Sequence, residues 1–160
     1  ISMFIKFGPF NITLALTPVV VGAIIYGPKA GGILGFIMGL VVLITNSEAF
    51  FVVNPVATIF VCLAKSTIAG IAAAYIYRLI NNKVASTVLA SISVPIINTA
   101  FFSICCLLFF FPTLKEWAAG ENTLIYLFGT MIGVQFLVEL AINSILSPVV
   151  LRLVETFNKK

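Results

Sequence analysis

Lys65 is the residue with the greatest chemical potential in this sequence, because it lies inside a long apolar run over residues 55–79. A charged side chain in the interior of a membrane costs about 3 kcal/mol or more, so its ammonium group must be paired or hydrated. Lys65 lies about ten residues, or roughly 15 Å, from the start of the run at Pro55. An ammonium group at this depth suits the neutralisation of an anionic ligand.

Glu139 is the only acidic residue inside a predicted membrane span, so a buried Lys65–Glu139 ion pair is the main alternative. Counted from Thr123, Glu139 lies roughly 24 Å deep, or about 9 Å deeper than Lys65. This mismatch favours a cavity that contains both groups, although the sequence leaves direct pairing open.

Two amides, Asn98 and Gln135, are expected at roughly 18–20 Å depth, near the level of Lys65. Gln135, Glu139 and Asn143 follow one another at intervals of four and therefore share one face of a helix. Such side chains either bind a ligand or hydrogen-bond between helices. Because these side chains converge on an intramembrane lysine, ligand binding is as well supported as hydrogen bonding between helices.

A second polar group is predicted outside the membrane and comprises Asn11, Thr13 and Asn54. Each of these residues suits either contact with a ligand or the cap of a helix. Aromatic residues at the same level form either an interfacial belt or a lid over a bound solute. They are Phe50, Phe51, Trp117 and residues 109–111.

Membrane helices must position these side chains, because 61% of the residues are hydrophobic and only 9% are charged. The mean hydropathy of +1.21 predicts an all-α integral membrane protein with a single transmembrane domain over residues 1–160. Roughly 20 residues cross a bilayer upright, so the first two predicted spans are marginal and the other three are ample. The predicted spans are residues 12–26, 30–45, 55–79, 84–111 and 123–151.

The basic residues predict a cytoplasmic C-terminus, because short cytoplasmic loops collect Lys and Arg. Lys6 and Lys115 fall on the opposite side, which places the first residue outside. An apolar start without an initiator Met then suggests a further helix upstream, for six spans in all. The predicted cytoplasmic residues are Lys29, Arg78, Lys83, Arg152, Lys159 and Lys160.

Gly31, Gly35 and Gly39 recur at every fourth residue and form one smooth helix face. One interpretation is close packing against another helix of this chain. The other is a docking face for a partner membrane subunit. The sequence does not separate the two.

The sequence offers nothing for catalysis, since it contains no His and no phosphate-cradling loop. Cys62, Cys105 and Cys106 lack the spacing of a metal site and suit helix packing. We therefore expect no enzyme activity, no cofactor, no metal and no nucleic-acid partner.

Residues 12–39, ITLALTPVVVGAIIYGPKAGGILGFIMG, resemble the substrate-binding S components of energy-coupling factor (ECF) transporters for vitamins. The resemblance rests on an apolar helix that ends in a Gly27-Pro28 corner and is followed by a glycine-rich helix. It extends loosely over the whole chain through the spacing of the later spans. The lead-in at residues 8–13 is most similar to the pantothenate group.

This resemblance implies a six-helix vitamin-binding subunit in the cell membrane, with the first helix largely missing from this chain. It implies partners, namely a transmembrane coupling (T) subunit and two cytoplasmic ATP-binding subunits, and a binder that topples to deliver its vitamin. The family's docking alanines lie on the missing helix. Lys65 would neutralise a vitamin carboxylate, while Asn98, Gln135 and Asn11 would bind amide and hydroxyl groups.

Other functions stay open at this point. An S component for riboflavin, folate or a thiamin-precursor pyrimidine fits the same pattern, and an uncharged vitamin would suit a Lys65–Glu139 pair better. A structural membrane protein with that internal pair is a different class. An autonomous ion-coupled carrier is weaker, because a single intramembrane acid offers little for a proton relay.

Overall fold

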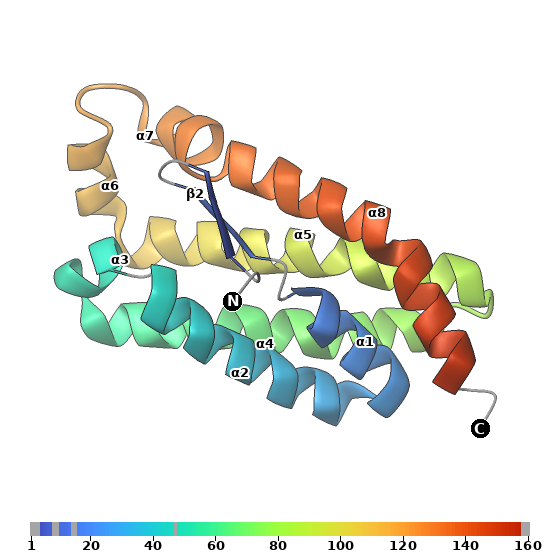
Figure 1. The fold of residues 1–160 in the computed structure, drawn as a ribbon. Helices are drawn as coiled ribbons and strands as arrows, with labels where there is room; N and C mark the ends of the chain where they lie inside the picture. The colour runs from blue at the N-terminus through green and yellow to red at the C-terminus, as the bar shows by residue number, and fades with distance from the viewer. Residues whose placement is uncertain (1–3, 8–9, 14–15, 47, 158–160) are drawn as a thin grey trace.

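The computed structural model describes residues 4–7, 10–13, 16–46 and 48–157 of the 160 residues. They form a two-stranded hairpin followed by a bundle of helices (Figure 1). The elements are β1 (Phe4–Phe7), β2 (Phe10–Thr13), α1 (Leu16–Tyr26), α2 (Pro28–Asn46), α3 (Glu48–Val53), α4 (Pro55–Leu79), α5 (Lys83–Phe109), α6 (Phe111–Trp117), α7 (Thr123–Ile125), the π-helix η1 (Tyr126–Met131) and α8 (Gly133–Phe157).

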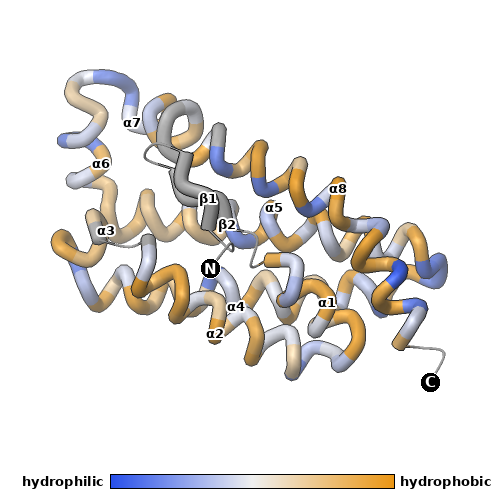
Figure 2. Tube along the Cα trace, in the orientation of Figure 1, coloured by the Kyte–Doolittle hydropathy of each residue, from blue (hydrophilic) through white to orange (hydrophobic). Residues whose placement is uncertain are grey.

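The helical membrane bundle predicted from composition is confirmed. Four helical stretches are long and apolar enough to cross a bilayer, and α1 is a shorter apolar helix. Apolar residues run along the helices, whereas α8 carries polar residues at intervals (Figure 2). The four stretches are Pro28–Thr45, Pro55–Leu79, Lys83–Phe109 and Gln135–Phe157.

Helix α4 lies at the centre of the bundle, with α2 on one side and α5 on the other. Small side chains make this possible, since Ala69, Ala73 and Ala90 are fully buried. Val20 of α1 and Val150 of α8 complete the same core. This core lies at the level of α1, and a second apolar core, which includes Ala57, Cys106 and Leu114, joins the other ends of α4 and α5 to α6.

The glycine face of α2 packs against α4. A methyl group added at Gly31, Gly35 or Gly39 would overlap the α4 backbone, at the carbonyl groups of Gly70, Ser66 and Cys62 respectively. The structure thus supports packing within the chain. The alternative, a docking face for a partner at Gly31, Gly35 and Gly39, is not supported, because α4 occupies that face.

The first predicted span, over residues 12–26, is shorter than expected. Helix α1 begins at Leu16, because residues 10–13 form β2 and pair antiparallel with β1. In this hairpin Asn11 lies opposite Lys6 and Thr13 lies opposite Phe4. Strand β2 lies beside α8, so the hairpin borders the interior of the bundle.

The last predicted span, over residues 123–151, is interrupted near its start and extends further. The π-helix η1 separates α7 from α8, and the Ile132 N–H donates to the Leu127 carbonyl at 2.9 Å. Glycines at 129 and 133 weaken the α-helical preference here. Helix α8 then continues to Phe157.

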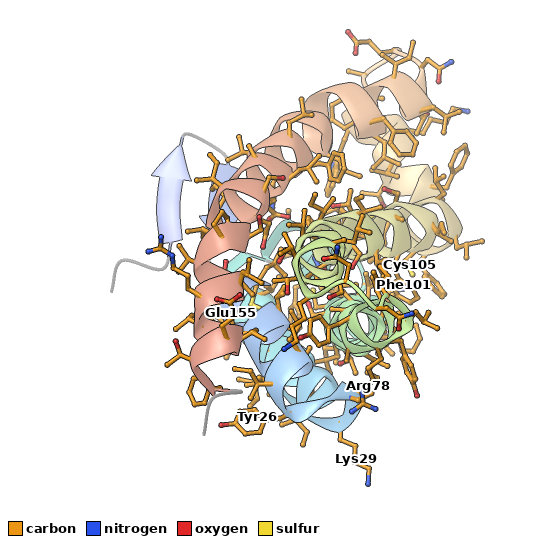
Figure 3. The ribbon with its side chains drawn as sticks, turned by 90° about the vertical axis from the view of Figure 1, so that its right-hand side faces the viewer. Tyr26, Lys29, Arg78, Phe101, Cys105 and Glu155 are labelled. Atoms are coloured by element: carbon orange, nitrogen blue, oxygen red, sulfur yellow. The ribbon has the colours of Figure 1, made fainter. Side chains whose placement is uncertain are left out.

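The corner that carries Lys29 and the turn that carries Arg78 and Lys83 lie at one end of the bundle (Figure 1), while Lys159 and Lys160 fall outside the described residues. This end holds the corner at Gly27 and the turn between α4 and α5, while α3, α6 and α7 lie at the other end (Figure 1). Lys29 and Arg78 lie close together there (Figure 3). Gly27 has a φ of 90°, and an added Cβ would meet the Arg78 guanidinium. Glycine is thus required at this corner.

Candidate ligand-binding site

Lys65 lies half-buried on α4, with its ammonium group directed toward α5. The Nζ atom is 4.7 Å from the centroid of the Phe102 ring. A cation over an aromatic face is stabilised by about 0.5–2 kcal/mol, depending on its exposure to water. The ring therefore provides part of the stabilisation that an intramembrane ammonium group needs.

Glu139 belongs to a row of polar side chains along α8. Its carboxylate accepts a hydrogen bond from Gln135 Nε2 at 3.2 Å, and its backbone carbonyl accepts one from Asn143 Nδ2 at 2.9 Å. Glu139 and Asn143 are buried. The shared face predicted from the spacing of these three residues is confirmed, and Gln135 already uses its amide group on Glu139.

Lys65 and Glu139 do not form an ion pair in the described part of the chain. The two groups are still close enough to attract one another through space. The structure therefore does not support the direct pair that the sequence left open, in keeping with the predicted difference in depth. Each charge therefore lies without its counter-ion in contact.

Two buried oxygen atoms lack a hydrogen-bond partner among the described residues: Asn98 Oδ1 on α5 and Thr17 Oγ1 on α1. A buried polar group without a partner costs about 1–3 kcal/mol. Asn98 lies one helical turn from Phe102, and thus on the same face of α5 as the ring beneath Lys65. Both oxygens therefore have unused capacity for a hydrogen bond.

Sequence reasoning missed Thr17, although a signal for it exists. Other threonines in the helices, such as Thr67 and Thr87, donate to the carbonyl four residues earlier. Thr17 has no such helical carbonyl, because α1 begins one residue before it. The position of Thr17 in the first turn of α1 therefore accounts for its unpaired hydroxyl.

The structure describes only part of the second polar group, which comprises Asn11, Thr13 and Asn54. Asn54 is exposed and caps α4, where its side-chain oxygen accepts a hydrogen bond from the Ala57 N–H at 3.1 Å. This role in capping accounts for Asn54 without a ligand. The side chains of Asn11 and Thr13 lie outside the described part of the structure.

Phe50 of α3 is the centre of an aromatic cluster that joins α3 to α5 and α6. Its ring lies 5.6 Å from Phe102, 5.1 Å from Phe110 and 5.3 Å from Trp117, centroid to centroid, each edge to face. We call these four residues the aromatic cluster. Phe51, the next residue of α3, is 44% exposed. The aromatic residues thus divide into a packed cluster and others that face outward.

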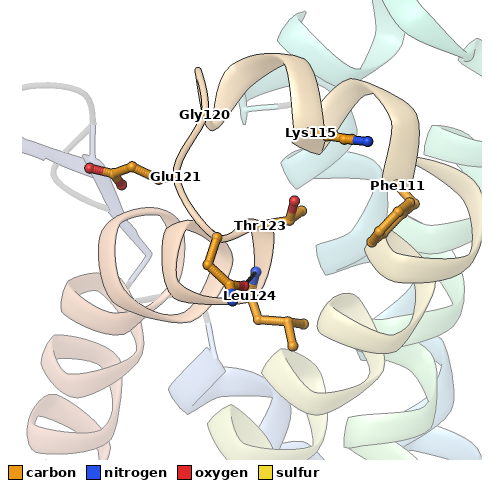
Figure 4. A pocket seen from close by; sticks show the side chains of 7 residues that line it. Phe111, Lys115, Gly120, Glu121, Thr123 and Leu124 are labelled. Carbon is orange, nitrogen blue, oxygen red and sulfur yellow. Dashed lines mark hydrogen bonds between the residues drawn. The ribbon is translucent and has the colours of Figure 1, made fainter.

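A separate hollow of about 500 Å³ lies in the connection between α6 and α7 (Figure 4). Its lining includes Lys115 and Glu121, while the Asn122 side chain accepts a hydrogen bond from the Leu124 N–H. Neither Lys65 nor Glu139 contributes to it. The better candidate is therefore the polar centre, by which we mean Lys65 on α4, Asn98 on α5, and Gln135 and Glu139 on α8.

The described residues contain no group of three His, Cys, Asp or Glu side chains arranged for a metal.

Comparison with known proteins gives two findings. Residues 1–151 match the family described as ECF transporter, substrate-specific component. The chain is also 27% identical over 157 residues to the pantothenic acid transporter PanT of Lactococcus lactis subsp. cremoris (strain MG1363), which covers 89% of this chain and 76% of that protein.

Proposed function

Because this chain belongs to the family of substrate-specific components of ECF transporters, we propose that it binds pantothenate outside the cell and delivers it through an ATP-driven importer. A substrate-specific component is not itself an enzyme. The likeness to a pantothenic acid transporter supports the choice of vitamin. The chemistry of the polar centre supports it independently.

The observation that carries the proposal is an intramembrane ammonium group that has an aromatic partner but no carboxylate in contact among the described residues. Pantothenate carries a carboxylate at one end, an amide in the middle and hydroxyl groups at the other end. In our proposal Lys65 binds the carboxylate. Asn98 Oδ1, which has no hydrogen-bond donor among the described residues, accepts a hydrogen bond from the amide N–H or a hydroxyl group of the vitamin. The Thr17 hydroxyl forms a further hydrogen bond with the vitamin.

Glu139 sets the orientation of the vitamin in this proposal. A buried carboxylate repels a second carboxylate, so the charged end of pantothenate points toward Lys65 and away from Glu139. The hydroxyl end then lies near the row on α8, where the Gln135 carbonyl and the Glu139 carboxylate accept hydrogen bonds. Asn11 and Thr13 of β2 are proposed to close the outer side.

Thermal unfolding of the purified protein tests the choice of vitamin. Pantothenate at 100 times its dissociation constant is expected to stabilise the folded protein by about 2.7 kcal/mol and to raise the Tm. Riboflavin, folate, biotin and thiamin-precursor pyrimidines serve as comparisons. A shift with one of these alone would reassign the vitamin, and no shift with any of them would exclude a vitamin site.

We also propose that the end carrying Lys29 and Arg78 faces the cytoplasm, as the concentration of basic residues there favours. A cysteine placed at Asn81 should then resist an impermeant maleimide in intact cells, whereas one at Glu121 should react. Both positions are exposed, and the native cysteines are buried. The reverse labelling pattern would invert the proposed topology.

The proposed partners are a transmembrane coupling subunit and two cytoplasmic ATP-binding subunits. They follow from family membership and from the chain's resemblance to S components, and no described surface of this chain is assigned to them. Affinity purification of the protein from its native membrane should recover ATP-binding subunits. Recovery of the chain without them would argue against an ATP-driven complex.

A further inference from the structure

The aromatic cluster connects the intramembrane charge to the segments at the outer end of the bundle. Lys65 lies over one face of Phe102, and Phe50 meets the same ring at an interplanar angle of 83°. Phe50 also meets Trp117 of α6 at 70°. A continuous row of contacts therefore leads from Lys65 through Phe102 and Phe50 to Trp117.

We propose that Phe50 is a positioning residue for the vitamin: it holds Phe102 beneath Lys65 and fastens α3 to α6 over the binding site. This inference rests on the proposed function, because it takes Lys65 as the group that binds the carboxylate. It predicts that α3 and α6 slow the dissociation of the bound vitamin and that the fluorescence of Trp117 changes when the vitamin binds.

Burial explains why substitution of Phe50 can break this row of contacts without displacing α6. Phe110 is 2% exposed and Leu114 is fully buried, so α6 is anchored to the bundle by its own residues. Helix α3 is only six residues long, and the cluster joins it to α5 and α6 through Phe50. Loss of the Phe50 ring therefore removes the ring contacts of α3 with α5 and α6, while α6 stays in place.

Geometry explains why an aromatic side chain is needed at this position. Edge-to-face contacts direct the positive edge of one ring at the negative face of another, which an aliphatic side chain cannot do. Leucine at position 50 would fill much of the space without fixing the orientation of Phe102 or Trp117. Tyrosine would retain the ring.

The Lys65 ammonium group makes this row of aromatic contacts respond to a bound ligand. In the described structure the Phe102 face holds Lys65. A bound carboxylate draws the ammonium group toward itself and thereby changes the field on Phe102 and on the rings behind it. Trp117 is the single tryptophan of the chain, so intrinsic fluorescence observes this end of the row alone.

The test compares the full chain with three variants in detergent or nanodiscs, by calorimetry and tryptophan emission during titration with pantothenate. We expect the unaltered protein to bind with a change in Trp117 emission. Phe50→Leu should bind about 10-fold more weakly, dissociate faster and lose the emission change. Phe50→Tyr should restore all three. Phe51→Leu, the matched exposed position on α3, should behave like the unaltered protein.

The outcomes separate this inference from the proposed function. No heat of binding with pantothenate in the unaltered protein would refute the vitamin assignment and, with it, the retention role. Binding with unchanged affinity, dissociation and emission response in Phe50→Leu would overturn the role of Phe50 alone. If Phe50→Leu does not fold, Trp117→Leu removes the same contact from the α6 side and must likewise speed dissociation.

Discussion

Replacement of Lys65 by methionine is expected to weaken pantothenate binding by about 30-fold or more. Truncation of one partner of a buried, hydrogen-bonded charge pair costs about 2–5 kcal/mol, and each 1.4 kcal/mol is about tenfold in affinity. In the variant the vitamin carboxylate would be left without a counter-ion inside the membrane-spanning region. Isothermal titration of Lys65→Met against the unaltered protein measures this loss.

The matched ligand for this experiment is pantothenol, in which an uncharged hydroxymethyl group replaces the carboxylate. Lys65→Met should bind pantothenol nearly as well as the unaltered protein does. Its Tm without ligand should not fall, because the substitution removes an intramembrane charge that contacts no carboxylate in the described part of the chain. Equal losses for both ligands would show that Lys65 supports the site without meeting the carboxylate.

Gly35→Ala is expected to produce a large loss of stability, because Gly35 lies in the glycine face that packs against α4. The new Cβ would overlap the Ser66 backbone carbonyl of α4, and a helix backbone yields less readily than a side chain. Overpacking of this kind costs about 1–3 kcal/mol. Thermal unfolding in detergent should show a lower Tm for Gly35→Ala.

Gly129→Ala provides the control for this substitution, because an added Cβ there would meet nothing within 4 Å. Its Tm should stay close to that of the unaltered protein. If Gly35→Ala were equally harmless, α2 and α4 would have to lie further apart than the structure shows.

The extent of the long helices could be predicted from sequence. Helix α4 occupies the predicted residues 55–79, since Asn54 caps it and Pro55 suits its first position. The row of Gln135, Glu139 and Asn143 was predictable for a related reason, as the helical period alone places these residues on one face. Both predictions depend on short-range rules.

The parts that escaped prediction depend on contacts between distant residues. Hydropathy over residues 4–13 does not distinguish a strand from a short span, and the pairing of β1 with β2 decides the matter. Phe50 and Phe51 look equivalent in the sequence, yet only Phe50 enters the cluster described here. The absence of a Lys65–Glu139 contact depends on helix placement, which depth counting only suggested.

The π-helix between α7 and α8 has a consequence for how this family member tolerates changes in chain length. A π turn holds one residue more than an α turn, and its Leu127–Ile132 hydrogen bond marks where that residue is accommodated. The extra residue shifts the helical phase, so the register of the α6–α7 connection is uncoupled from that of α8. The bulge therefore accommodates one extra residue between α7 and α8, while Glu139 and Asn143 of α8 stay buried.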